Sequence, residues 1–148
     1  MPVIATNKSA FHDYAVLEDI SAGIVLSGPE VKSARQGNVN LKGSYVSIRG
    51  SEIWLINAHI GHYKPSGTRE PPTPTRPRKL LLTAKEIARL IGKLKEKGLT
   101  AVPLRVYTLN NRIKVAVGIC RGKTKHDKRE TLKKRDIERE MRHALKRR

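Results

Sequence analysis

Several short stretches of the chain have Val, Ile, Leu and Tyr that cluster or alternate with polar residues. Between residues 45 and 49, Val46 and Ile48 alternate with Ser47 and Arg49, which is the period of a half-buried β-strand. Gly, Ser and Asn separate such stretches, as they do in turns between strands. About six strands are predicted, over residues 13–20, 22–26, the two arms of a hairpin within 44–60, 100–109 and 112–121.

The residues between these strands predict how the strands connect. Ser21 to Gly23 is a turn signal, and Gly50 with Ser51 supplies the hairpin turn. Asn110 and Asn111 tolerate positive φ angles and suit a tight turn. Pro103 lacks an amide hydrogen, so its strand is expected to lie at a sheet edge or to bulge there.

A short helix is predicted within residues 27–37. Pro29 suits the first turn of a helix, and the Glu30 carboxylate complements the positive end of the helix dipole. Gly37 then provides a stop signal.

The strongest helix prediction covers residues 83–98. Thr83 and Glu86 have the spacing of a Thr-x-x-Glu capping box, and Gly98 closes the segment. Four apolar residues follow the box at i, i+3, i+4 and i+7, and they are Ile87, Leu90, Ile91 and Leu94.

Short antiparallel strands with one inserted helix indicate a mainly β protein with flanking helices. The expected architecture is a small closed barrel like the oligonucleotide-binding fold, over residues 1–121. Five prolines between residues 61 and 77 predict a mobile surface loop. Residues 122–148 are expected to form a basic C-terminal tail.

The charge of the chain indicates a polyanionic partner. Thirty-one Lys and Arg residues against 13 Asp and Glu residues give a net charge of +18, of which the 28 residues after Cys120 carry +8. Lys and Arg side chains that neutralise phosphates release counterions, so nucleic acid is favoured over a merely solvated surface. A membrane surface is disfavoured, because no basic stretch has a bulky apolar face.

Cysteine and histidine residues narrow the chemistry further. A single cysteine, Cys120, excludes a disulfide or a cysteine-based zinc site within one chain. His59 and His62 have no accompanying carboxylate cluster, so no metal or other cofactor is expected.

With no signal peptide or membrane span, the expected location is cytoplasmic. No spacing of acids, bases or nucleophiles calls for an enzyme.

The stretch "GKT" at residues 122–124 resembles the end of a phosphate-binding loop. Such a loop requires a glycine at the position that Val117 occupies, and a helix after a parallel strand. A nucleotide-hydrolysing site is therefore rejected.

The tail has the pattern of a weak amphipathic helix. Ile137, Met141 and Leu145 recur every four residues, after Asp127 and Glu130 at capping-box spacing. Such a short, strongly charged helix is marginal alone in water. A frayed terminus and a segment that becomes helical against RNA phosphates both fit this pattern.

Two other stretches have two readings each. In "NKSAFHDY" (residues 7–14), amide, ammonium, imidazole and phenol groups suit contacts with unpaired bases, but a loop that caps the barrel is favoured. In "RPRKLLL" (residues 76–82), we expect the leucines mostly in the core and the cations facing solvent or phosphate.

A set of ordered motifs resembles the SmpB family, the small protein B that partners transfer-messenger RNA (tmRNA) in bacterial ribosome rescue. The matching stretches cover residues 7–129, and they are "NKSAFHDY", "AGIVLSGPEVKSARQGNVNLKGSYV", "AHIGHY", "TRPRKLLL", "GLTAVPLRVY", "IKVAVGICRGK" and "HDKR". The resemblance implies an oligonucleotide-binding-like barrel that binds the tRNA-like domain of tmRNA at its elbow and replaces the missing anticodon arm. It also implies a tail that enters the empty messenger channel at the decoding centre, where it becomes helical.

The resemblance assigns residues and partners. The implied RNA-facing group is Asn7, Lys8, His12, Glu30, Lys32, Arg35, Lys79 and Leu81, joined by the cations Arg76 and Arg78. The implied ribosome-contacting tail group is Gly122, Lys123, Lys125, His126, Asp127, Lys128 and Arg129, with His126 stacking on a ribosomal base. Implied partners of the monomeric protein are tmRNA, the ribosome with its 16S ribosomal RNA and, through tmRNA, EF-Tu and alanyl-tRNA synthetase.

The chain departs from the usual family pattern at a few positions. Ser21 stands where many members have an acid, Thr83 replaces Asn or His, Thr124 replaces a lysine, and "TPTRP" differs from the Asp-Pro-x-Arg loop. Two alternatives to the rescue adaptor are an RNA-processing enzyme with a basic tail and a structural ribosomal protein.

Overall fold

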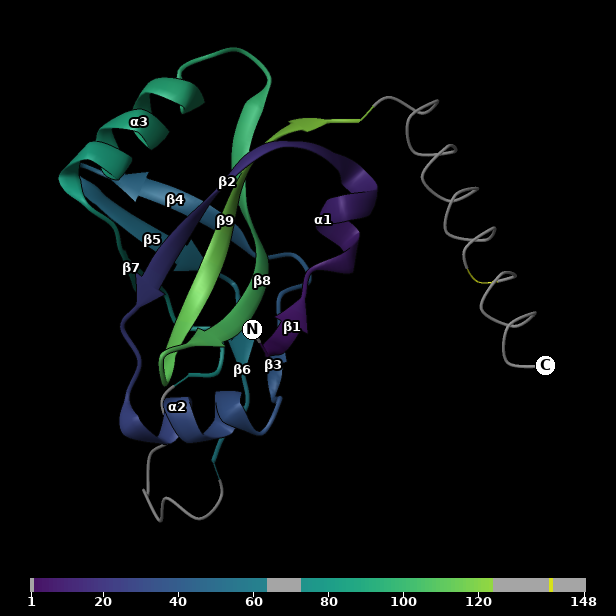
Figure 1. Ribbon diagram of the computed structural model, residues 1–148, viewed down its shortest axis with the longest axis vertical. Helices are drawn as coiled ribbons and strands as arrows, with labels where there is room; N and C mark the ends of the chain where they lie inside the picture. Colours follow the sequence, from purple (N-terminus) through teal and green to yellow (C-terminus); the bar gives the residue numbers. More distant parts are fainter. Residues whose placement is uncertain (1, 64–72, 124–138, 140–148) are drawn as a thin grey trace.

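Three long antiparallel strands form the centre of the fold. β2 (Tyr14–Ile24) pairs with β9 (Arg112–Gly122), which pairs on its other edge with β8 (Leu99–Leu109). The computed structural model in Figure 1 describes residues 2–63, 73–123 and 139. Each long strand has 11 residues and spans on the order of 35 Å.

Shorter strands extend this centre on both sides, in the order β1-β8-β9-β2-β7-β5-β4. They are β1 (Val3–Thr6), β4 (Tyr45–Arg49), β5 (Glu52–Ile56) and β7 (Arg78–Leu81), while β3 (Val39–Asn40) and β6 (His59–Ile60) form a separate pair. The sheet curls until β4 contacts β8, but no backbone ladder joins these two strands in the described part of the chain. The mainly β class and its oligonucleotide-binding-like character are confirmed. The closed barrel of about six strands is corrected to an open, curled sheet of seven described strands.

Within residues 2–63 and 73–123, three helices flank the sheet: α1 (Lys8–Asp13), α2 (Gly28–Arg35) and α3 (Ala84–Leu94). Both predicted helices are confirmed, and each begins with a complete capping box, Ser27 with Glu30 in α2 and Thr83 with Glu86 in α3. Helix α3 ends at Leu94, earlier than predicted. In Figure 1, α1 and α2 lie at opposite ends of β2, whose length separates them.

Two predictions near the N-terminus are wrong. The two strands predicted at 13–20 and 22–26 are one strand, β2 (Tyr14–Ile24), because Ser21, Ala22 and Gly23 pair with β9 instead of turning. Residues 8–13 form helix α1 instead of a capping loop, because the side chain of Asn7 accepts a hydrogen bond from the Ala10 amide and so caps the helix.

The predicted turn chemistry is confirmed elsewhere. Asn110 and Asn111 join β8 to β9 with φ angles of 51° and 62°. The register of β8 against β9 shifts between Pro103 and Arg105, so the strand bulges where proline removes the amide hydrogen.

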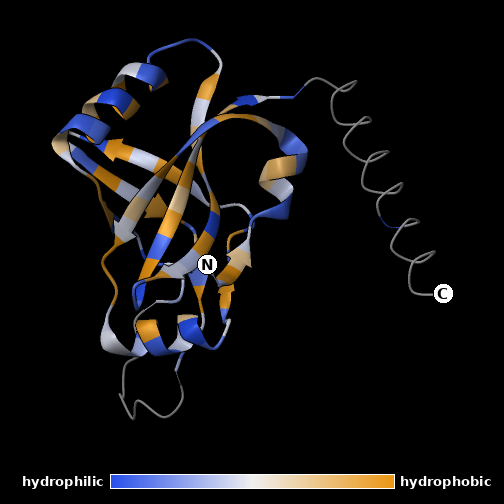
Figure 2. Ribbon diagram, viewed as in Figure 1, coloured by the Kyte–Doolittle hydropathy of each residue, from blue (hydrophilic) through white to orange (hydrophobic). Residues whose placement is uncertain are grey.

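The apolar core lies inside the curled sheet. Hydrophobic residues alternate with less hydrophobic ones along β4 and β5 (Figure 2), and Ile53, Leu55, Leu90 and Val115 are among the fully buried residues. In the described ranges, no helix is long and apolar enough to cross a bilayer, and no three His, Cys, Asp or Glu residues gather to hold a metal ion. Residues 61–63 and 73–77 of the predicted loop carry neither helix nor strand, and residues 64–72 lie outside the described residues.

Candidate nucleic-acid interface

The candidate interface is built on the start of α2. The Ser27 hydroxyl accepts a hydrogen bond from the Glu30 amide, and the Glu30 carboxylate accepts one from the Ser27 amide at 2.9 Å. This reciprocal cap fixes the first turn of the helix and directs the Glu30 side chain inward, toward β7.

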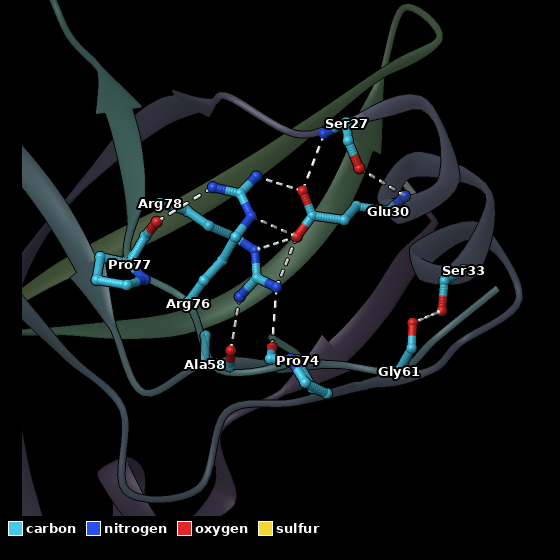
Figure 3. A network of polar contacts seen from close by, with 9 residues as sticks. All are labelled: Ser27, Glu30, Ser33, Ala58, Gly61, Pro74, Arg76, Pro77 and Arg78. Carbon is cyan, nitrogen blue, oxygen red and sulfur yellow. Dashed lines mark hydrogen bonds and ion pairs between the residues drawn. The ribbon is translucent and has the colours of Figure 1, made fainter. Parts of the chain in front are cut away.

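Glu30 forms a buried ionic network with Arg76 and Arg78 (Figure 3). Arg78 Nε donates to Glu30 Oε2 at 2.7 Å, and the other Arg78 nitrogens donate to the carbonyls of Ala58 and Pro74. Arg76 donates to both carboxylate oxygens. One carboxylate thereby ties α2 to β7 and to the segments that precede β6 and β7.

The protonation state of Glu30 depends on these donors. Burial alone raises the pKa of the carboxyl group, but hydrogen bonds from Arg76, the Ser27 amide and Arg78 outweigh burial and lower the pKa to about 2. Burial also lowers the pKa of Arg78, and the Glu30 carboxylate opposes that shift. At neutral pH the network is therefore an ion cluster whose charges are compensated internally.

Two residues assigned to the RNA-facing group have buried side chains. The expectation that the cations of 76–79 face solvent or phosphate is wrong for Arg78, whose side chain is fully buried. The Glu30 carboxylate is also buried, and three groups already donate to it. Both side chains connect α2 to β7 from within the fold. The guanidinium of Arg76 is likewise bound to Glu30, although part of this side chain remains exposed.

A groove of about 390 Å³ runs beside α2 and the β8–β9 turn. Ile24, Leu26, Val31, Leu81 and Ile113 provide its apolar wall. Its cations are Arg35, Arg112 and Lys114. The Arg35 guanidinium donates to the Asn111 carbonyl at 2.8 Å and bridges the helix and the turn. Apolar walls beside three cations suit a ligand with flat rings and phosphates, which is the chemistry of a nucleic acid.

The neighbouring surface of α2 carries another predicted residue. Lys32 is exposed, with its ammonium group 5.6 Å from the ring centroid of Tyr63, a cation–π contact. On β7, Lys79 and Leu81 point away from the core, on the strand face opposite buried Arg78 and Leu80. The structure thus brings Lys32, Arg35, Lys79 and Leu81 to one end of the body.

Asn7, Lys8 and His12 lie at the other end of β2, on or beside α1. Asn7 is buried, and its amide group caps α1 and donates to the Pro103 carbonyl at 2.8 Å. His12 Nδ1 lies 2.9 Å from an Asp13 carboxylate oxygen, and Lys8 is exposed. These three residues are therefore not part of the α2 groove.

The predicted tail begins at the α1 end of the body. Gly122 is the last residue of β9 and pairs with Tyr14. The next residue, Lys123, donates from its amide to the Asp13 carbonyl and from its ammonium group to the Phe11 carbonyl. The predicted tail residues Lys125, His126, Asp127, Lys128 and Arg129 lie outside the described residues.

Sequence reasoning missed Arg112 and Lys114 as groove residues. Their spacing of two places both side chains on one face of β9, which the sequence does reveal. The sequence does not reveal that this face of β9 lies opposite α2. The contact between α2 and the β8–β9 region joins residues about 80 positions apart.

A strongly basic, curled antiparallel sheet with a cation-lined groove defines a nucleic-acid-binding protein of the oligonucleotide-binding-like class. The model of the family described as "SmpB protein" matches residues 4–147. The chain belongs to the SmpB family.

Similar proteins share both sequence and fold. The "SsrA-binding protein" of Sulfurihydrogenibium sp. (strain YO3AOP1) is 55% identical over 97% of this chain and 94% of its own length. That of Chloroflexus aggregans is 51% identical, over 99% and 92%. A solved structure described as "tmRNA-SmpB: a journey to the center of the bacterial ribosome" contains a chain that is 42% identical. It superposes with a TM-score of 0.69, over 89% of this chain and 95% of that one.

Proposed function

We propose that this protein is a non-enzymatic RNA adaptor that binds the tRNA-like domain of tmRNA and delivers it to stalled ribosomes for trans-translation. The observation that carries the proposal is the α2 groove, in a chain whose full-length relatives are named for binding SsrA, the tmRNA. The ribosome is the second partner and the cytoplasm is the place of action.

The geometry supports a division of labour between the two ends of the body. We assign binding of the tRNA-like domain to the α2 end, with Lys32, Arg35, Lys79 and Leu81 in contact with RNA and Glu30 and Arg78 holding them in place. Asn7, Lys8 and His12 lie at the α1 end, where the chain leaves toward the tail. An adaptor that spans from an RNA elbow to the decoding centre requires such separated ends.

A binding experiment tests the RNA specificity. The tRNA-like domain of tmRNA and an unrelated structured RNA of equal length are titrated against the full chain at physiological salt. The adaptor function predicts clear preference for the tRNA-like domain. Equal affinities would contradict it, because a merely basic surface binds both RNAs through counterion release alone.

Truncation after Lys123 tests the division of labour. We expect the truncated protein to keep most of its affinity for the tRNA-like domain, because the α2 groove is intact and far from the cut. It should lose peptide tagging on stalled ribosomes in a reconstituted translation system. Loss of RNA binding on truncation would show that the tail, and not the body, supplies the docking surface.

A further inference from the structure

The outer face of β4, β5 and β7 exposes several large apolar side chains. Alternate residues of these strands, such as Val46, Ile53 and Leu80, are buried in the core, so their neighbours point outward. Two outward residues are large, apolar and exposed, Tyr45 at 46% and Leu81 at 52%. Val25, the residue that follows β2, is exposed at 46%. Contiguous apolar surface of this kind marks an interaction site.

Strand register places a tryptophan at the centre of this face. Trp54 on β5 pairs with Ser47 on β4 and with Lys79 on β7. The Val25 amide donates to the Lys79 carbonyl at 3.0 Å, which puts Val25 next in the same row. Leu81 lies two residues further along β7 from Lys79, on the same side of the strand. Val25, Tyr45, Trp54, Lys79 and Leu81 form what we call the stacking face.

The indole ring of Trp54 is held in place by a neighbour on its own strand. Trp54 Nε1 donates to Glu52 Oε2 at 3.2 Å, and Lys79 Nζ lies 3.5 Å from Glu52 Oε1. Glu52 is thus charge-compensated by Lys79, and its hydrogen bond fixes the orientation of the ring. A preoriented aromatic ring beside a lysine is the arrangement that binds an unpaired base and its phosphate.

We propose that the stacking face receives unpaired bases of an RNA loop, with Trp54 as the ring on which a base stacks and Lys79 as the phosphate contact. The face is continuous with the α2 groove, because Leu81 belongs to both. An RNA strand that fills the cationic groove can therefore extend directly onto it. This inference rests on the proposed function and adds to it the class of nucleotide that is recognised.

Trp54 is the only tryptophan of the chain, so its fluorescence reports on this face alone. The probe is the tRNA-like domain of tmRNA, with binding measured independently by mobility shift. Stacking predicts quenching of Trp54 fluorescence that saturates together with the mobility shift. Trp54→Ala should weaken binding about tenfold, since an aromatic–base stack contributes on the order of that factor. The salt dependence should not change, because the indole neutralises no phosphate.

Two further variants separate stacking from loss of folding. Trp54→Tyr keeps a stacking ring and should retain affinity within about threefold, as expected for sequence-tolerant stacking. Leu17→Ala removes an exposed apolar side chain from β2, outside the stacking face, and should bind like the unmodified protein.

Unchanged Trp54 fluorescence at saturation, or full affinity of Trp54→Ala, would overturn this inference while leaving the adaptor function intact. Fluorescence that changes with protein concentration in the absence of RNA would assign the face to a second copy of the chain and also overturn it. If the unmodified protein shows no preference for the tRNA-like domain, the adaptor function itself fails and this inference fails with it.

Discussion

Arg78 donates to Glu30 at 2.7 Å although neither side chain reaches solvent, with exposed fractions of 0% and 4%. The pair joins the first turn of α2 to β7, the two elements that carry Lys32, Arg35, Lys79 and Leu81. A buried ion pair adds little net stability over apolar residues, but removing one partner leaves an uncompensated charge. The relative placement of the interface elements therefore depends on both residues being present.

Replacing Glu30 by Gln should destabilise the protein and weaken RNA binding without changing its salt dependence. The variant leaves Arg78 buried without its counter-charge, so we expect a loss of about 3–5 kcal/mol in the free energy of unfolding. Denaturant titration measures that loss. The slope of log K against log [salt] should stay constant, because no phosphate contact is removed.

Glu52→Gln provides a matched control, since it makes the same chemical change at an exposed, salt-bridged position. It should alter the free energy of unfolding by less than about 1 kcal/mol. If Glu30→Gln reduced the salt slope and left stability unchanged, Glu30 would face the RNA after all.

The contribution of Glu30 to stability should disappear in acid. Its pKa is about 2 in the folded protein and about 4.5 in the unfolded chain, so the unfolded state takes up the proton first as pH falls. The stabilisation, about 3 kcal/mol from this shift, is complete above about pH 5 and is lost as pH falls toward 2. The difference in unfolding free energy between the unmodified protein and Glu30→Gln should therefore narrow over that range. A difference that stays constant down to pH 2 would contradict the lowered pKa.

Local signals in the sequence were sufficient for several parts of the fold. The Thr83–Glu86 capping box, the Asn110–Asn111 turn and the bulge at Pro103 each depend on neighbouring residues, so the sequence predicts them directly. The buried position of Arg78 could not be predicted from local signals. It depends on an ion pair with Glu30, which lies 48 positions earlier in the sequence.

The candidate site was predictable to a similar extent. The net charge and the family motifs predicted an RNA partner and the chain segments that would contact it. They did not predict which of these segments lie on the same face of the protein. Asn7 illustrates the limit, because a polar residue suited to contact a base is instead buried as a helix cap. The groove likewise joins residues far apart in sequence, since the Arg35 guanidinium donates to the Asn111 carbonyl and both residues line it.

Arg112→Ala and Lys114→Ala should each reduce the steepness of the salt dependence of RNA binding by about one phosphate contact. Both cations line the groove beside α2, although neither was assigned from the sequence. Mobility-shift titrations with the tRNA-like domain at several salt concentrations measure the slope. Lys97→Ala removes an exposed cation just beyond α3, outside the groove, and should leave the slope unchanged. A slope that is the same for all three variants would show that RNA does not enter the groove.

The bulge of β8 at Pro103 packs against a glycine on the neighbouring strand, β9. It places Leu104 over Gly118 at the centre of β9, where an added Cβ would lie 2.8 Å from the Leu104 Cγ. Leu104 is itself fully buried, so it has little room to yield. Glycine is therefore required at residue 118 by packing, and not by backbone conformation.

Gly118→Ala should accordingly lower the free energy of unfolding by about 1–3 kcal/mol, the usual cost of overpacking a core. Gly92→Ala is the matched control, because a Cβ at that helix position meets nothing within 4 Å. It should instead stabilise the protein by about 0.5–1 kcal/mol, as alanine favours helix over glycine. In Gly118→Ala combined with Leu104→Ala, the clash is gone, so the combined loss should be smaller than the sum of the two single losses. Strict additivity in thermal or denaturant unfolding would show that the two side chains do not compete for the same space.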